Sequence, residues 1–185
     1  MSLEAAAAFC VQKTNYNVEL EHFIYRLLQQ PDCDVDLILR YYEIDKDSVQ
    51  QHLLTAIDKF KNGCTAAPTL SPNIILLLEK SWMITSIQLS QQKIRSAAML
   101  LGIIDTDALR GILLESCPLI LRIPRHTLHE DLVELIRVSP ENKYVTSVVP
   151  LTEPLTAGFS TPAIPVGEAL KKYALNLTNL AQQGK

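Results

Sequence analysis

Apolar residues recur at helical spacing through most of the first 138 residues. Between residues 19 and 30 they fall at i, i+3, i+4, i+7 and i+8, which lines one face of a helix that Pro31 ends. The same spacing predicts further helices at residues 35–42, 49–60, 72–89, 96–104, 106–116 and 127–138. No segment here alternates strongly enough to predict a strand. The sequence therefore predicts an all-α domain.

The segment 72–89 predicts the longest helix. Ser71 can cap its start, while Pro72 occupies the first helical position. Apolar residues cover much of its circumference, so we expect other helices to cover it on several sides and place it at the centre of the domain. A Thr127/Glu130 pair has the spacing of a capping box and predicts the start of the last helix.

The two halves of the helical region are similar in pattern. Aligning Val18 with Ile94 sets an offset of 76 positions (94 − 18), and six of the eleven pairs between 18–28 and 94–104 are then apolar on both sides. This predicts a duplicated four-helix unit, with repeats at about 3–61 and 71–138. Chance similarity between amphipathic helices is the alternative.

The pattern changes after residue 138. Residues 139–167 hold five of the ten prolines and no helical spacing, which predicts an extended linker, with a short strand at 143–149. Helical spacing returns at 168–183 and predicts a terminal helix. A linker followed by a new helix suggests a domain from a longer protein.

Composition narrows the possible partners and the compartment. The formal net charge of −3 and the pI of about 5.8 give no basic surplus, so we expect no nucleic acid partner. The longest apolar run, residues 5–11, is far shorter than the roughly 20 residues that span a membrane, so we expect no membrane association. The start carries no secretory signal, and the four widely spaced cysteines predict reduced thiols in a cytoplasmic protein.

Three patterns could carry chemistry, and each has a simpler interpretation. The only Gly-Lys pair, residues 184–185, lacks the earlier glycine of a phosphate-binding loop, so we expect no ATP at these residues. The HTLHE run at 126–130 has neither zinc-hydrolase spacing nor an evident third ligand, so we expect no metal. Cys10 and His22 could form a nucleophile and a base, but an apolar setting favours packing. We expect no catalytic residues.

Two stretches resemble a known family motif. Residues 18–28, VELEHFIYRLL, and their counterpart at 94–104 resemble the two repeats of the N-terminal domain of Clp/Hsp100 ATPases. The resemblance covers about residues 3–138 and implies a double Clp repeat fold at 1–138. Residues 169–185 resemble the entry segment of the first AAA+ module, which implies a linker at 139–167 and the start of that module at 168–185. The start lacks the Asn-Pro-containing helix start usual in such domains, which leaves an N-terminal truncation open.

Within the family, three features are similar to the ClpV (TssH) type of type VI secretion: Leu70-Ser71-Pro72, Trp82 and residues 92–101. That resemblance implies a non-enzymatic substrate-recognition domain that binds a helix of the sheath subunit TssC/VipB for ATP-driven sheath disassembly. It implies ATP and Mg for downstream AAA+ modules only, a homohexameric parent protein and a monomeric isolated domain. A ClpB- or ClpC-type domain that binds unfolded substrate or an adaptor is the alternative within the family. A free-standing helical scaffold or hydrolase is the alternative outside it.

A partner helix needs an apolar groove, and two packed repeats leave such a seam. The offset of 76 places residues 6–8 and 11 opposite 82–84 and 87, which predicts a first helix before residue 19. We place the groove near this first helix and the loop before the long helix, where the candidates are Phe9, Lys13, Leu70, Ser71 and Ile74. Core packing is the alternative for Phe9 and Ile74. Leu70 is the strongest candidate, since a large apolar residue in a proline-bounded loop is hard to assign to the core.

Overall fold

The structure is a computed structural model that describes residues 2–144. Eight α-helices, two short strands and two 3-10 turns make up this described part of the chain. They are α1 (Ser2–Gln12), β1 (Asn17–Val18), α2 (Leu20–Leu28), α3 (Asp34–Tyr41), α4 (Lys46–Ile57), β2 (Thr69–Leu70), α5 (Pro72–Ile87), α6 (Ser96–Asp105), α7 (Asp107–Ser116), η1 (Ile120–Arg122), α8 (Arg125–Arg137) and η2 (Pro140–Tyr144). None of these helices is long and apolar enough to cross a membrane.

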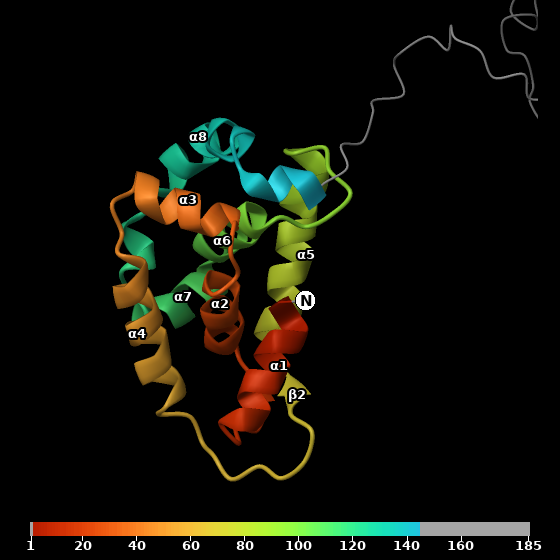
Figure 1. Cartoon of the computed structure of the whole chain (residues 1–185), viewed down its shortest axis with the longest axis vertical. Helices are drawn as coiled ribbons and strands as arrows, with labels where there is room; N and C mark the ends of the chain where they lie inside the picture. The colour runs from red at the N-terminus through yellow and green to blue at the C-terminus, as the bar shows by residue number, and fades with distance from the viewer. Residues whose placement is uncertain (1, 145–185) are drawn as a thin grey trace, which may run out of the picture. The chain divides into compact units, whose positions relative to one another are not determined.

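The helices follow the predicted duplicated order. α1 to α4 are followed by α5 to α8, and shifting α2 by 76 positions gives 96–104 (20 + 76 to 28 + 76), which coincides with α6. Within the first half α1 and α4 pack against α2, and within the second half α5, α7 and α8 pack against α6 (Figure 1). The all-α fold with two repeats is confirmed.

The central helix is α6, and the prediction that placed the helix at 72–89 in the centre is wrong. α6 contacts α3 of the first half as well as α5, α7 and α8, and eight of its ten residues are buried. Gly102 of α6 allows the close approach of α5, because a Cβ there would lie 3.3 Å from the Ser81 Oγ. α5 buries one side against α6 and leaves the other exposed.

The start of α2 is held by a buried histidine. His22 Nδ1 accepts a hydrogen bond from the Glu19 amide at 3.2 Å, which caps the helix, and its Nε2 lies 3.0 Å from Asn15 Oδ1. Burial lowers the pKa of His22 from 6.5 to about 4, so the ring is neutral near pH 7. His22 is therefore a buried, hydrogen-bonded residue, which agrees with the packing interpretation.

A parallel pair of two-residue strands joins the two halves near this histidine. Asn17 pairs with Thr69 and Val18 with Leu70, so the chain leaving α1 and the chain entering α5 run side by side. The sequence did not predict these strands, because two residues are too few to show alternation. They fix where β2 and the start of α5 lie relative to the first repeat.

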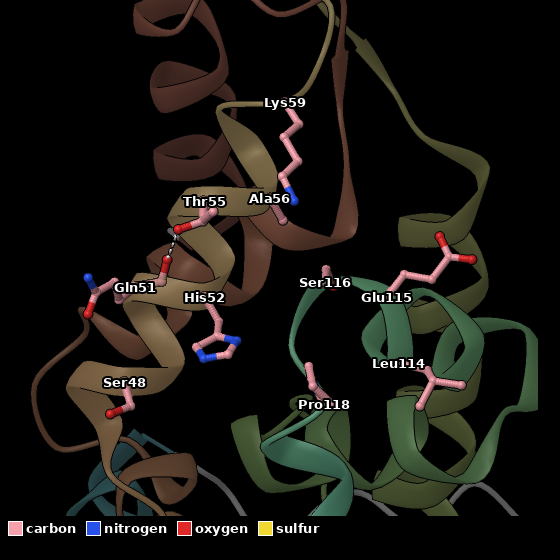
Figure 2. A pocket seen from close by; sticks show the side chains of 10 residues that line it. All are labelled: Ser48, Gln51, His52, Thr55, Ala56, Lys59, Leu114, Glu115, Ser116 and Pro118. Carbon is pink, nitrogen blue, oxygen red and sulfur yellow. Dashed lines mark hydrogen bonds between the residues drawn. The ribbon is translucent and has the colours of Figure 1, made fainter.

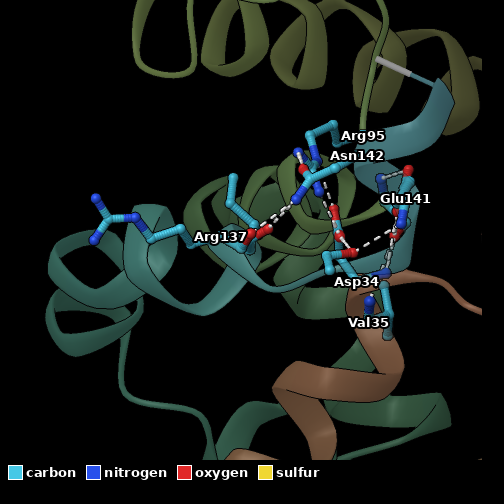
Figure 3. A network of polar contacts seen from close by, with 9 residues as sticks. Asp34, Val35, Arg95, Arg137, Glu141 and Asn142 are labelled. Carbon is cyan, nitrogen blue, oxygen red and sulfur yellow. Dashed lines mark hydrogen bonds and ion pairs between the residues drawn. The ribbon is translucent and has the colours of Figure 1, made fainter.

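A buried ion pair connects the two halves at the far end of the helices (Figure 3). Arg95, directly before α6, donates from Nε and Nη2 to the two carboxylate oxygens of Asp34 at the start of α3, both at 2.8 Å. Both side chains are almost completely buried, at 1% and 0% exposure. Breaking such a pair leaves an uncompensated buried charge, which costs about 3–5 kcal/mol.

The segment that follows α8 completes this ion pair. Glu141 accepts hydrogen bonds from the Asp34 and Ser96 amides, each at 3.0 Å, and so caps the starts of α3 and α6 with one carboxylate. Asn142 accepts from Arg95 Nη1 at 2.6 Å, and the Ser139 hydroxyl donates to Asp34. Burial raises the pKa of Glu141, with the Asp34 charge adding to the effect and the hydrogen bonds opposing it.

Two boundary predictions differ from the structure for local reasons. Residues 139–144, expected in the linker, fold onto the domain because Ser139, Glu141 and Asn142 form hydrogen bonds around the Asp34–Arg95 pair. The last helix begins at Arg125 after Pro124, so the predicted Thr127/Glu130 capping box is wrong. Pro72 does occupy the first position of α5, whereas the Ser71 side chain makes no cap. The rest of the predicted linker, most of the predicted strand at 143–149 and the segment 168–185 lie outside the described residues.

Replacing Glu141 with alanine tests the role of this segment. We expect Glu141→Ala to lower the free energy of unfolding by about 2 kcal/mol, because two helix-start amides and the Ser96 hydroxyl lose a charged acceptor in a half-buried site. Chemical denaturation measures the change. The matched control is Glu134→Ala, since Glu134 is exposed and pairs only with exposed Arg137, and a change within about 0.5 kcal/mol is expected. Equal losses in the two variants would contradict the assigned role.

The buried His22 predicts how stability depends on pH. The unfolded chain takes up a proton below pH 6.5, whereas the folded chain resists it until about pH 4, so the free energy of unfolding should fall as the pH drops through this window. Unfolding measured between pH 7 and 4 should show this fall in the wild type and a weaker one in His22→Gln. The control His52→Gln changes an exposed histidine and should keep the wild-type slope. An unchanged slope in His22→Gln would refute the assignment.

Candidate protein-binding surface

Helix α5 presents an exposed apolar face. Its side toward α6 is buried, whereas large apolar side chains on the outer side are between 48% and 73% exposed: Ile75, Trp82, Met83 and Ile87. Ile75 and Trp82 are seven positions apart, two turns of helix, so they lie on the same face. A cluster of large exposed apolar side chains on one helix is typical of a protein interaction surface.

Leu70 lies directly before this helix, and the strand pair holds it in place. The Ser71 amide donates to the Val18 carbonyl, and the Thr69 amide donates to the Tyr16 carbonyl, both at 3.1 Å. The Leu70 side chain is nevertheless 39% exposed. An apolar side chain held out on fixed backbone suits contact with a partner, because little conformational entropy remains to be lost on binding. We call Leu70, Ile75, Trp82, Met83 and Ile87 the α5 face.

Of the five residues predicted for the groove, Leu70 belongs to the α5 face. Phe9 is 7% exposed and stacks on the Tyr25 ring at 5.0 Å, with the Arg26 guanidinium 4.7 Å from its ring centre, so it packs inside. Lys13 is partly exposed, and its Nζ forms an ion pair with Asp58 at 2.7 Å.

The side chains of Ser71 and Ile74 are both buried. Ile74 has no exposed surface, because the turn of α5 that carries it faces the core, and so it packs in the core rather than lining a groove. Ser71 is 3% exposed, and its backbone is used in the strand pair and in the first turn of α5. For Phe9 and Ile74 the structure therefore favours the core alternative.

The apolar pattern of α5 did not reveal Ile75, Trp82, Met83 and Ile87 as surface residues. An apolar pattern around the whole circumference of a helix predicts burial on all sides. The pattern alone does not show whether a given side is covered by the same chain or by a partner. Leu70 was the one residue of the α5 face that the sequence indicated, because it lies in the loop directly before the helix. Ile75 lies five residues beyond that loop position and could have been included with it.

A cleft in the described part of the chain lies elsewhere, between α4 and α7. It encloses about 610 Å³ and is lined largely by polar side chains; Figure 2 shows His52 extending from α4 toward α7. Its three hydroxyl groups are engaged locally. Thr55 donates to the Gln51 carbonyl and Ser116 to the Ile112 carbonyl, both at 2.8 Å, whereas Ser48 donates at 2.6 Å to the Asp45 carboxylate that caps α4. All three hydroxyls thus serve the helices that carry them.

The chemical alternatives from the sequence are also not supported by the geometry. The Cys10 thiol donates to the Asn17 carbonyl at 3.2 Å, and burial raises its pKa, which keeps it protonated. His129 Nε2 lies 3.4 Å from Asp105 Oδ2, and Arg125 binds the same carboxylate. Within residues 2–144 no three His, Cys, Asp or Glu side chains are grouped so as to hold a metal ion.

These features define a class: a duplicated α-helical domain with an exposed apolar helix face. The sequence profile of the Clp repeat (R) N-terminal domain matches residues 1–116. The chain belongs to this Clp repeat N-terminal domain family.

Relatives from two branches of the family align over nearly the whole chain. The chaperone protein ClpB of Yersinia enterocolitica is 31% identical over 186 aligned residues, which cover 99% of this chain and 21% of ClpB. The AAA+ ATPase ClpV1 of Pseudomonas aeruginosa is 29% identical over 188 aligned residues, which cover 100% of this chain and 21% of ClpV1. The chain thus spans about a fifth of the length of these curated relatives.

Solved structures of ClpV proteins share the fold. A structure from work on the ATPase ClpV, the TssB-TssC sheath and the accessory HsiE protein superimposes with a TM-score of 0.72 and 30% identity, covering 76% of this chain and 87% of that one. A complex of a ClpV N-domain with a VipB peptide superimposes with a TM-score of 0.63 and 28% identity, covering 73% of this chain and 82% of that one.

Proposed function

We propose that this domain is the substrate-recognition part of a ClpV-type AAA+ ATPase and that it binds a helix of the type VI secretion sheath subunit TssC/VipB. The observation that carries the proposal is the α5 face, which gathers on and beside one helix five of the twelve large apolar residues that are exposed in residues 2–144. Similarity to a ClpV N-domain that was solved with a VipB peptide supports the choice of partner.

The α5 face suits a helical partner. Leu70, Ile75 and Trp82 are spaced over about three turns, which fits apolar side chains at i, i+3 or i+4, and i+7 of an amphipathic helix. Trp82 supplies the largest contact area, since aromatic anchors carry much of the energy of protein interfaces. Polar residues beside the face, such as Lys80 and Gln88, would form the rim.

The parent protein supplies the energy in this proposal. Downstream AAA+ modules would bind ATP and Mg, assemble as a homohexamer in the cytoplasm and pull the bound sheath subunit apart, while this domain, a monomer in isolation, does no chemistry. A micromolar contact, about −8 kcal/mol, suffices because six tethered copies facing a polymer raise the effective concentration of binding sites.

Sequence similarity to ClpB supports a second candidate within the family. A ClpB-type domain would bind exposed apolar segments of unfolded proteins, and the α5 face could serve that purpose as well. The two functions differ in selectivity. A sheath domain should prefer the N-terminal TssC helix to a reduced, unfolded model protein, whereas a disaggregase domain should show the opposite order.

Intrinsic fluorescence gives a direct test, because the chain has one tryptophan and it lies on the α5 face. A tryptophan-free TssC N-terminal peptide should shift the Trp82 emission to shorter wavelength as it covers the ring. We expect Leu70→Asp and Ile75→Asp each to weaken binding about ten-fold or more, since a charge replaces an apolar contact.

The matched control is Val133→Asp, which changes an apolar residue on α8 that is 55% exposed, against 49% for Ile75. It should bind like the wild type. Unchanged affinity in folded Leu70→Asp and Ile75→Asp would remove the α5 face from the proposal. Stronger binding of the unfolded protein than of the peptide would favour the ClpB-type function.

A further inference from the structure

The α5 face contains one acidic side chain. Glu79 is exposed and lies four residues after Ile75, three before Trp82 and four before Met83. Residues three and four apart are neighbours on a helix, so apolar side chains flank the carboxylate along the helix in both directions. Lys80, the next residue, is turned about 100° away around the helix and projects from its flank.

The Glu79 carboxylate makes no ion pair or hydrogen bond with any other residue of the described region. Other exposed acidic side chains do form ion pairs: Asp58 pairs with Lys13, and Glu134 pairs with Arg137. Glu79 is therefore solvated in the free domain, and nothing in residues 2–144 compensates its charge if water is removed from it.

A partner that covers Ile75 and Trp82 also covers Glu79. Burying a carboxylate without a partner costs several kcal/mol, whereas a cation placed opposite it recovers much of that loss and rejects partners that lack the cation. Arg suits this role best, because its planar guanidinium can donate two hydrogen bonds to one carboxylate.

We propose that Glu79 determines specificity at the α5 face and selects helices that carry a basic side chain three or four positions from their apolar anchors. The proposal rests on the function proposed above and adds the charge pattern of the partner. An apolar segment without that basic residue binds weakly, because its contact with Ile75 and Trp82 leaves the Glu79 carboxylate desolvated and unpaired.

A double-mutant cycle tests this selection. The variants are Glu79→Gln, which keeps shape and removes charge, and Glu79→Lys, which reverses it. The probes are the TssC N-terminal peptide and versions in which each of its Lys and Arg residues is replaced in turn by Gln or Glu. Trp82 fluorescence reports the affinity, and Glu115→Gln on α7 is the control for loss of a distant exposed carboxylate.

We expect Glu79→Gln to weaken binding of the unmodified peptide about ten-fold. It should have no further effect on one particular Gln-substituted peptide, which identifies the paired residue, and Glu79→Lys should recover binding to the corresponding Glu-substituted peptide. Glu115→Gln should bind like the wild type.

Other outcomes separate this inference from the proposed function. If Leu70→Asp weakens binding but Glu79→Gln does not, or if every Gln-substituted peptide loses affinity equally in both proteins, the selection by Glu79 is wrong and the proposed function stands. If the wild-type domain does not bind the unmodified peptide at all, the proposed function fails, and this inference fails with it.

Discussion

The ion pair between Asp34 and Arg95 fixes how the two halves of the domain meet. Both charges are buried. Moving an ion from water into a protein interior costs several kcal/mol unless an opposite charge and hydrogen bonds replace the lost water. Here Ser139, Glu141 and Asn142 supply such hydrogen bonds around the pair. The second carboxylate, that of Glu141, is held by the amides that begin α3 and α6, where the helix dipoles favour negative charge.

This constraint also sets the position of the α5 face. Arg95 directly precedes α6, α6 packs closely on α5 at Gly102, and the strand pair holds the entrance to α5 from the other end. α5 is thus held to the first repeat directly at its N-terminal end and through α6 along its middle, so its outer side chains stand on a rigid support. Rigid presentation lowers the entropy that binding must overcome, which favours the peptide binding proposed for this face.

The sequence predicted the helices and the duplication well, because both depend on apolar spacing. It failed where a side chain acts through distant partners. Nothing local marks Glu141 as a cap for α3 and α6, which lie 107 and 45 residues away along the chain, and a proline-rich segment is typical of a linker. Within the candidate site, Leu70 was identified from its loop, whereas Ile75 and Trp82 were taken for core residues because periodicity does not reveal which apolar side remains uncovered.

We have proposed that this domain meets another protein at the α5 face. Titration of the ¹⁵N-labelled domain with a TssC N-terminal peptide, followed by amide and Trp82 indole shifts, tests it most directly. We expect the largest changes on Leu70, Ile75, Glu79 and Trp82. Changes gathered along the α4–α7 cleft around His52 and Leu114, with α5 unmoved, would contradict it.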